Sequence, residues 1–239
     1  MIKSPDITIA TTTAPCRKLR ARLAPFLPAL PMFPLEGVQL FPSAMLPLHV
    51  FEPRYRELTA ACLMRGGIMA VATLCPGFAA DYHGRPPVRR VAGVGKIVAH
   101  RRNPDGTYNI LLRGLGRVRI DEELPATGLR AFREVRARLL RDRWPTGFDL
   151  AVGRRTLVVL TERLASLLPQ GGAALRALCD AELQPRRLCD VLSAALVRPP
   201  RSRRQLLELR DIPARMDLLS TELARMIAQL HGQTASGAN

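Results

Sequence analysis

The sequence predicts an α+β protein, with a small β-barrel that carries one inserted helix and is followed by a helical bundle. Prolines punctuate the apolar stretch 30–55, short strand patterns recur up to residue 140, and leucines take up helical spacing beyond Trp144-Pro145. About six or seven short strands are expected, a number that suits a closed or half-closed barrel. The predicted parts are a flexible basic extension over 1–29, the barrel over 30–143, the bundle over 146–231 and a disordered tail over 232–239.

The first strands are expected in the proline-rich stretch, because its prolines exclude a helix before Pro53. Strand segments are expected at Met32-Phe33, at Leu40-Phe41 and over 46–50. The prolines of these segments are expected at edges, bulges or first positions, where no ladder N–H is missed. They are Pro31, Pro34, Pro42 and Pro47.

One helix is expected to begin at Glu52-Pro53. Proline is tolerated at the first helical position, and an acidic residue beside it favours the positive end of the helix dipole. Tyr55, Leu58 and Cys62 lie on one face of this helix, and Gly66-Gly67 end it.

The remaining strands follow from further patterns. Residues 68–74 are an almost continuous apolar run, typical of a buried strand, and a strand resumes over 91–99. The turn sequence NPDG at 103–106 predicts a hairpin, and the glycines within 114–116 predict a bend or bulge. Apolar and charged residues alternate within 130–140 and predict a last strand.

Residues 75–90 are rich in proline and glycine and are expected to form a loop, which is either a binding loop or a connection without a binding role. Phe78 and Tyr82 favour the first alternative. Beyond the barrel, helices are expected over 150–168, 173–183, 185–197, 203–209 and 212–230.

The net charge of +16 invites a nucleic-acid function, but only three of the 36 basic residues are lysine. We attribute this skew mainly to genome composition. The odd number of five cysteines, without a Cys-x-x-Cys pair, predicts reduced thiols and neither zinc nor disulfides. No apolar run reaches the length of a membrane span, and a cytoplasmic location is expected.

Three stretches resemble the LON substrate-binding domain, the amino-terminal domain of Lon ATP-dependent proteases. They are FPLEGVQLFPSAMLPLHVFEPRYREL at 33–58, VGKIVAHRRNPDGTYNILLRGLGRVRI at 94–120 and RRQLLELRDIPARMDLL at 203–219. The resemblance implies a PUA-like β pseudobarrel, here as a free-standing protein. The family signature residues, interpreted as structural, are Pro34, Leu35, Phe41, Pro42, Pro47, His49, Phe51, Glu52, Pro53, Arg54 and Tyr55.

The sequence carries no catalytic motif of a Lon protease. Gly95-Lys96 is followed by Ile97 in place of Ser or Thr, so no phosphate-binding loop is present, and no Gly-x-Ser-x-Gly or His-Glu-x-x-His occurs. The four histidines lack ligand spacing. We therefore expect neither catalysis nor a cofactor or metal.

Without catalysis, the expected function is that of a binding module. The resemblance implies that such a domain engages exposed apolar or unfolded polypeptide segments, with a Lon-type ATPase as a further candidate partner. A groove or an open strand edge could take an extended segment by backbone pairing. The predicted lining residues are Met32, Phe33, Phe41, Met45, Phe78 and Tyr82. Core or loop packing is the alternative for each of them, and it is the favoured interpretation for Phe33 and Phe41.

The alternative is RNA or DNA binding on an arginine-rich face, as in other PUA-like barrels. The candidate residues are Arg85, Arg89, Arg90, Arg101, Arg102, Arg113, Arg117 and Arg119. Against it, aromatic residues make up only 5% of the chain, so platforms for base stacking are few.

Overall fold

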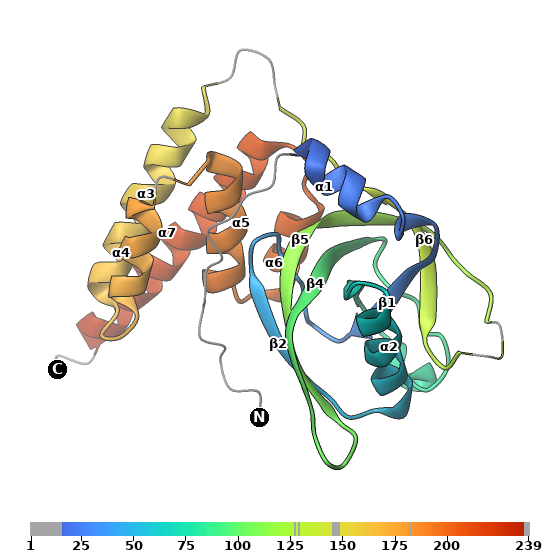
Figure 1. Cartoon of the computed structure of the whole chain (residues 1–239). Coiled ribbons are helices and arrows are strands. Elements are labelled where there is room, and N and C mark those ends of the chain that lie inside the picture. Colours follow the sequence, from blue (N-terminus) through green and yellow to red (C-terminus); the bar gives the residue numbers. More distant parts are fainter. Residues whose placement is uncertain (1–15, 127, 129, 145–148, 182, 237–239) are drawn as a thin grey trace. The chain divides into compact units, whose positions relative to one another are not determined.

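The computed structural model describes residues 16–126, 128, 130–144, 149–181 and 183–236. The chain divides between Arg141 and Asp142 into two compact units. The first is built mainly from strands and the second from helices (Figure 1). The predicted fold class, a barrel with an inserted helix followed by a helical part, is confirmed.

One mixed sheet of six strands forms the first unit, in the order β2-β5-β4-β3-β1-β6. Its strands are β1 (Leu30–Leu35), β2 (Met45–Val50), β3 (Ile68–Thr73), β4 (Val91–Arg102), β5 (Tyr108–Glu123) and β6 (Arg133–Leu139). The second half of β5 also pairs with β6, so β5, β4, β3, β1 and β6 close into a ring. The predicted hairpin is formed by β4 and β5, with a bulge beside Gly114 and Gly116.

The interior of the ring is an apolar core. Alternate residues of all five ring strands meet there, and only inward-facing residues of a closed ring can do so. They are Leu30, Met32, Ile68, Ala70, Ala72, Ala92, Val94, Val118, Ile120, Val135 and Ala137.

A second core lies on the opposite face of the sheet, against α2 (Pro53–Met64). Glu52 caps this helix with extended backbone and Pro53 is its first residue, as predicted. Tyr55, Leu58 and Cys62 are buried against the sheet, and Gly66-Gly67 follow with positive φ. Burial raises the pKa of the Cys62 thiol to about 12, so this thiol stays protonated and unreactive at neutral pH.

The prediction of a strand at Leu40-Phe41 is wrong. These two residues are buried at 1% exposure and belong to none of the six strands. Their backbone instead crosses directly over glycines of β4 and β5. A Cβ atom at Gly93 would lie closer than 3.0 Å to the Leu40 carbonyl, and one at Gly114 would meet the Phe41 carbonyl in the same way. The glycines therefore make room for a covering segment.

The chain before β1 differs from the predicted flexible extension over 1–29. Residues 1–15 lie outside the described part, but α1 (Cys16–Leu23) and the 3-10 turn η1 (Leu27–Ala29) are ordered. Leu23 is fully buried in the interior core, and Leu19 packs beside it at helical spacing. The sequence did not indicate this packing, because arginines surround Leu19 and Leu23 and make the segment look exposed.

The second unit consists of five helices in the described part of residues 142–239. They are α3 (Leu150–Leu167), α4 (Gly172–Asp180), α5 (Pro185–Leu196), α6 (Pro200–Glu208) and α7 (Ile212–Ser236). The Asp149 carboxylate caps α3 by accepting from the Ala151 N–H at 2.7 Å. Helix α7 packs against α3, α5 and α6.

The predicted disordered tail over 232–239 differs from the structure, since α7 continues through Gly232 to Ser236. One glycine costs a helix about 1 kcal/mol, which does not by itself end it. No helix in the described part of the chain is long and apolar enough to cross a membrane.

Candidate functional site

Strand β2 leaves one of its edges open. It pairs in antiparallel register with β5, from Met45 opposite Arg113 to Val50 opposite Tyr108. In the described ranges it pairs with no other strand. An open edge carries backbone N–H and C=O groups that another extended chain can bond.

The position of Pro47 shows which backbone groups face outward. The Ala44 carbonyl accepts from the Gly114 N–H at 2.8 Å, so the residues at even positions in β2 bond to β5. Pro47 has no N–H and sits at an outward position, where none is needed. Met45 and His49 share its orientation, so their N–H groups point away from β5.

The side chains of the outward positions form a row along one face of β2. Met45 is half-buried, Pro47 and His49 are exposed, and Phe51 is 62% exposed directly after the strand. The His49 and Phe51 rings stack with centroids 6.1 Å apart. His49 Nδ1 bonds the Asn109 side chain at 2.8 Å, which fixes the ring against β5.

The other face of β2 is anchored. Val50 is buried in the second core, and Leu46 and Leu48 pack against that core. The open edge is therefore held by a packed surface behind it, which lowers the entropy lost when a ligand binds.

The start of α2 fixes the loop 75–90 next to β2. The Glu52 carboxylate accepts from the Tyr82 hydroxyl at 2.6 Å and from Arg54 Nε at 3.0 Å. Arg54 Nη1 donates to the Tyr82 carbonyl at 3.0 Å, and the guanidinium lies over the Tyr55 ring at 4.6 Å. The hydrogen bond to Glu52 raises the pKa of Tyr82, and burial raises the pKa of Tyr55 to about 12. These signature residues thus hold a loop.

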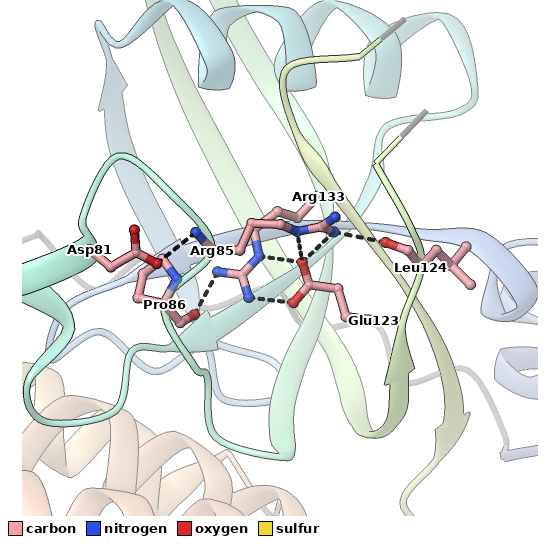
Figure 2. Close-up of polar contacts among 6 residues, drawn as sticks. All are labelled: Asp81, Arg85, Pro86, Glu123, Leu124 and Arg133. Atoms are coloured by element: carbon pink, nitrogen blue, oxygen red, sulfur yellow. Dashed lines mark hydrogen bonds and ion pairs between the residues drawn. The ribbon is translucent and has the colours of Figure 1, made fainter. Parts of the chain in front are cut away.

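A second cluster holds the other end of this loop (Figure 2). Glu123, at the end of β5, accepts from Arg85 Nε at 2.6 Å and from Arg133 Nε at 2.8 Å. Arg85 Nη2 also donates to the Leu124 carbonyl at 2.8 Å, and Arg133 Nη1 to the Pro86 carbonyl at 2.9 Å. The loop is thus held by hydrogen bonds at both ends, and its role as a binding loop stays a prediction.

The charge of Glu123 depends on both arginines. Partial burial would raise its pKa, but the hydrogen bonds and positive charges of Arg133 and Arg85 outweigh burial, so the pKa is lowered. Glu123 is therefore ionised at neutral pH and forms ion pairs with both residues.

We expect Glu123→Gln to reduce stability by about 1–2 kcal/mol at neutral pH and to raise hydrogen exchange of loop amides between residues 76 and 85. Because the pKa of Glu123 is lowered on folding, its carboxylate stabilises above the ordinary carboxyl pKa and ceases to do so as the pH falls through the lowered value. The difference in unfolding free energy should therefore be constant from about pH 6 to 8 and shrink as the pH falls below the ordinary carboxyl pKa of about 4.3. A difference that stays constant in acid would contradict this assignment.

The predicted lining residues separate into two sets. Met32, Phe33 and Phe41 are 0%, 3% and 1% exposed, so a ligand would not reach them in this conformation. Met32 lies in the interior core and Phe33 in the second core, and Phe41 is buried in the segment that covers the glycines. Met45 lies on β2, and Phe78 and Tyr82 are half-buried on the loop with ring centroids 6.1 Å apart.

The signature residues also separate. Pro34 is buried in β1, Leu35 packs against the second core, and Pro42 follows the segment that covers the glycines. Pro47, His49 and Phe51 instead lie exposed on the row along β2. Their period-two spacing next to a proline was the available signal for an edge strand. Arg133 and Glu123 carried no signal in the sequence, because their pairing depends on the register of β5 and β6.

The arginines proposed for nucleic acid do not gather in one place. Arg117 is 3% exposed, and Arg85 is engaged by Glu123. Arg90 and Arg101 lie near opposite ends of β4, a strand of 12 residues that spans roughly 40 Å at 3.3 Å per residue. A single arginine-rich surface over these eight residues is therefore not formed.

The described residues contain no group of three or more His, Cys, Asp and Glu side chains that could hold a metal ion. The candidate site thus consists of an open strand edge, a row of side chains beside it and a fixed loop. Such an arrangement can bind an extended chain.

Known proteins match this chain over most of its length. The ATP-dependent protease La (LON) substrate-binding domain family matches residues 29–225. The Lon protease of Paraburkholderia phytofirmans is 26% identical over 206 residues, which cover 83% of this chain and 24% of that protein. The chain thus spans about a quarter of the length of the curated relatives it matches.

Two solved structures share the fold. The N-terminal domain of the Mycobacterium avium complex Lon protease has a TM-score of 0.62 at 19% identity, over 82% of this chain and 98% of that one. The Lon N-terminal domain protein from Xanthomonas campestris has a TM-score of 0.58 at 22% identity, over 80% and 96%. Fold, signature and sequence match agree, and the chain belongs to the LON substrate-binding domain family.

Proposed function

We propose that this chain binds extended, apolar segments of unfolded polypeptides and catalyses no reaction itself. The observation that carries the proposal is the open edge of β2, where the N–H groups of Met45 and His49 face outward beside the exposed ring of Phe51. The family match is to a substrate-binding domain and not to a catalytic one.

Binding would proceed by strand addition. A client segment would pair with the outward N–H and C=O groups of Met45 and His49 and with the Pro47 carbonyl, and its side chains would contact the row along β2. Backbone pairing tolerates many sequences, which suits unfolded clients. Phe51 would supply the apolar anchor, since large aromatic side chains dominate binding energy at such surfaces.

A recognition module of this kind leaves processing to a partner. We infer that a Lon-type ATPase is the partner of the corresponding class, and that recognition takes place in the cytoplasm. The test is a pull-down of such an ATPase from a lysate by the full chain, in the presence of client peptide. Loss of the ATPase with the Phe51→Ala variant would support a role in which the chain bridges client and ATPase.

Strand addition is tested with N-methylated peptides. A fluorescent nine-residue apolar peptide without charged side chains is compared with two derivatives, N-methylated at its even or at its odd central positions. Edge pairing uses every second N–H of the ligand, so one derivative should lose at least about tenfold in affinity and the other should bind like the parent. Equal affinities of the two derivatives, measured by fluorescence anisotropy, would rule out pairing on an edge.

A protein variant supplies the second arm. Phe51→Ala should weaken peptide binding by about tenfold or more without a change in melting temperature, because the ring is 62% exposed. Met64→Ala removes an apolar side chain that is 82% exposed on α2 and serves as the matched control. Binding should persist at high salt, whereas single-stranded RNA tested in parallel should dissociate. Tight RNA binding at physiological salt without peptide binding would overturn the proposal.

A further inference from the structure

The face of the sheet next to the open edge of β2 is basic. Three cross-strand rows of β2, β5 and β4 compose it, because directly opposed residues share a face. We call this surface the basic face. Its rows are Met45–Arg113–Lys96, Pro47–Leu111–Ala99 and His49–Asn109–Arg101.

The composition of the basic face is one-sided. Lys96, Arg101 and Arg113 are basic, and none of its residues is acidic. Met45, Pro47 and Leu111 are apolar and at least partly accessible between the charges. An apolar centre flanked by cations complements a segment that is itself apolar and carries a carboxylate.

Lys96 and Arg113 form the strongest feature of the basic face. They lie directly opposite each other on β4 and β5, a placement that is unfavourable for like charges. Both are half-buried, so water screens their repulsion only in part. The described part of the chain offers neither of them an acidic partner.

Arg113 also has an unsatisfied donor. Its Nε atom is buried and makes no hydrogen bond in the structure. Buried donors without a partner are rare in folded proteins, and each calls for an acceptor. A carboxylate beside Arg113 would pair with its guanidinium and offset the repulsion from Lys96.

From these observations we infer that the β2 edge prefers apolar segments that carry a Glu or Asp side chain, which is bound by Arg113 and attracted by the neighbouring charge of Lys96. This inference rests on the proposed function and names its class of client. A strand added to β2 lies about 10 Å from β5, since neighbouring strands are about 4.8 Å apart. An arginine and a glutamate side chain span that distance together, passing over Met45. By the same spacing β4 lies about 14 Å away, so Lys96 adds positive charge behind Arg113 and does not contact the carboxylate directly.

The test compares two labelled nine-residue apolar peptides that differ at one central residue, Glu or Gln. The wild type should bind the Glu peptide about tenfold more tightly at low salt, and the ratio should shrink as salt rises. Arg113→Gln should bring the ratio close to one, chiefly by weakening binding of the Glu peptide, and Lys96→Gln should lower the ratio in part. Arg113→Lys keeps the charge and should retain part of the preference.

Arg138→Gln is the matched control. Arg138 is 67% exposed on β6 and lies outside the basic face, so its loss should leave the ratio unchanged. Thermal unfolding of each variant shows that the fold is kept.

The possible outcomes distinguish the two proposals. If the wild type binds both peptides equally, the carboxylate preference is overturned and the proposed function stands. If it binds neither peptide, the proposed function fails and the preference fails with it. Equal weakening of both peptides by Arg113→Gln would assign that residue to packing. If Arg113→Gln abolishes binding of single-stranded RNA and leaves peptide binding unchanged, the basic face is assigned to nucleic acid. Both of these results of Arg113→Gln would overturn the carboxylate preference.

Discussion

Gly114→Ala is expected to lower the free energy of unfolding by about 3 kcal/mol or more, at the upper end of the range for overpacked cores. A Cβ atom at Gly114 would lie closer than 3.0 Å to the Phe41 carbonyl oxygen. The atoms in the way belong to a backbone and not to the end of a flexible side chain. Relief therefore requires moving the whole segment at Leu40-Phe41, in which both residues are buried and Leu40 is part of the second core. Urea unfolding followed by circular dichroism measures the loss.

Gly232→Ala is the control for this substitution. Gly232 lies within α7 with no atom within 4 Å of a Cβ placed there. Alanine in a helix is more stable than glycine by about 1 kcal/mol, so this variant should be neutral or slightly more stable. If both variants lost a similar amount of unfolding free energy, the close approach of the Leu40-Phe41 segment to Gly114 would not be what makes Gly114→Ala destabilising.

Elements set by local chemistry were predictable from the sequence. The turn NPDG marks the β4–β5 hairpin, Pro53 marks the start of α2, and Gly66-Gly67 mark its end, because each of these residues restricts its own backbone. The segment at Leu40-Phe41 was not predictable, since an apolar pair looks the same in a strand and in a cover. Only the glycines opposite, far away in the sequence, distinguish the two.

The candidate site was predicted in part for the same reason. An open strand edge was expected as one route of binding, and Met45 was among the expected residues. Met32 and Phe33 were grouped with it because apolar side chains in neighbouring strands have equal weight in a sequence pattern. Which of them faces a core depends on ring closure by β5 and β6, and that is a property of the register.

Asp190→Ala is expected to destabilise the helical unit by about 3–5 kcal/mol, the range for breaking a buried ion pair by removing one partner. Arg215 is 1% exposed and donates to Asp190 at 2.9 Å and to Asp142 at 3.1 Å. Burial alone would lower the pKa of Arg215, but the two carboxylates outweigh burial and raise the pKa. A guanidinium is not deprotonated in proteins, so Arg215 stays charged after Asp190 is lost, with only part of its compensation left.

Two further variants separate this mechanism from simple loss of volume. The double variant Asp190→Leu/Arg215→Met removes both charges and keeps the site filled, so it should be less destabilised than Asp190→Ala alone. Asp121→Ala breaks an exposed pair with Arg138, whose side chains are 37% and 67% exposed, and should change stability by less than about 1 kcal/mol. Thermal and urea unfolding give the ranking. If the double variant proves no more stable than Asp190→Ala, the stability of the helical unit depends on the geometry of the ion cluster itself, and not on neutralising one buried cation.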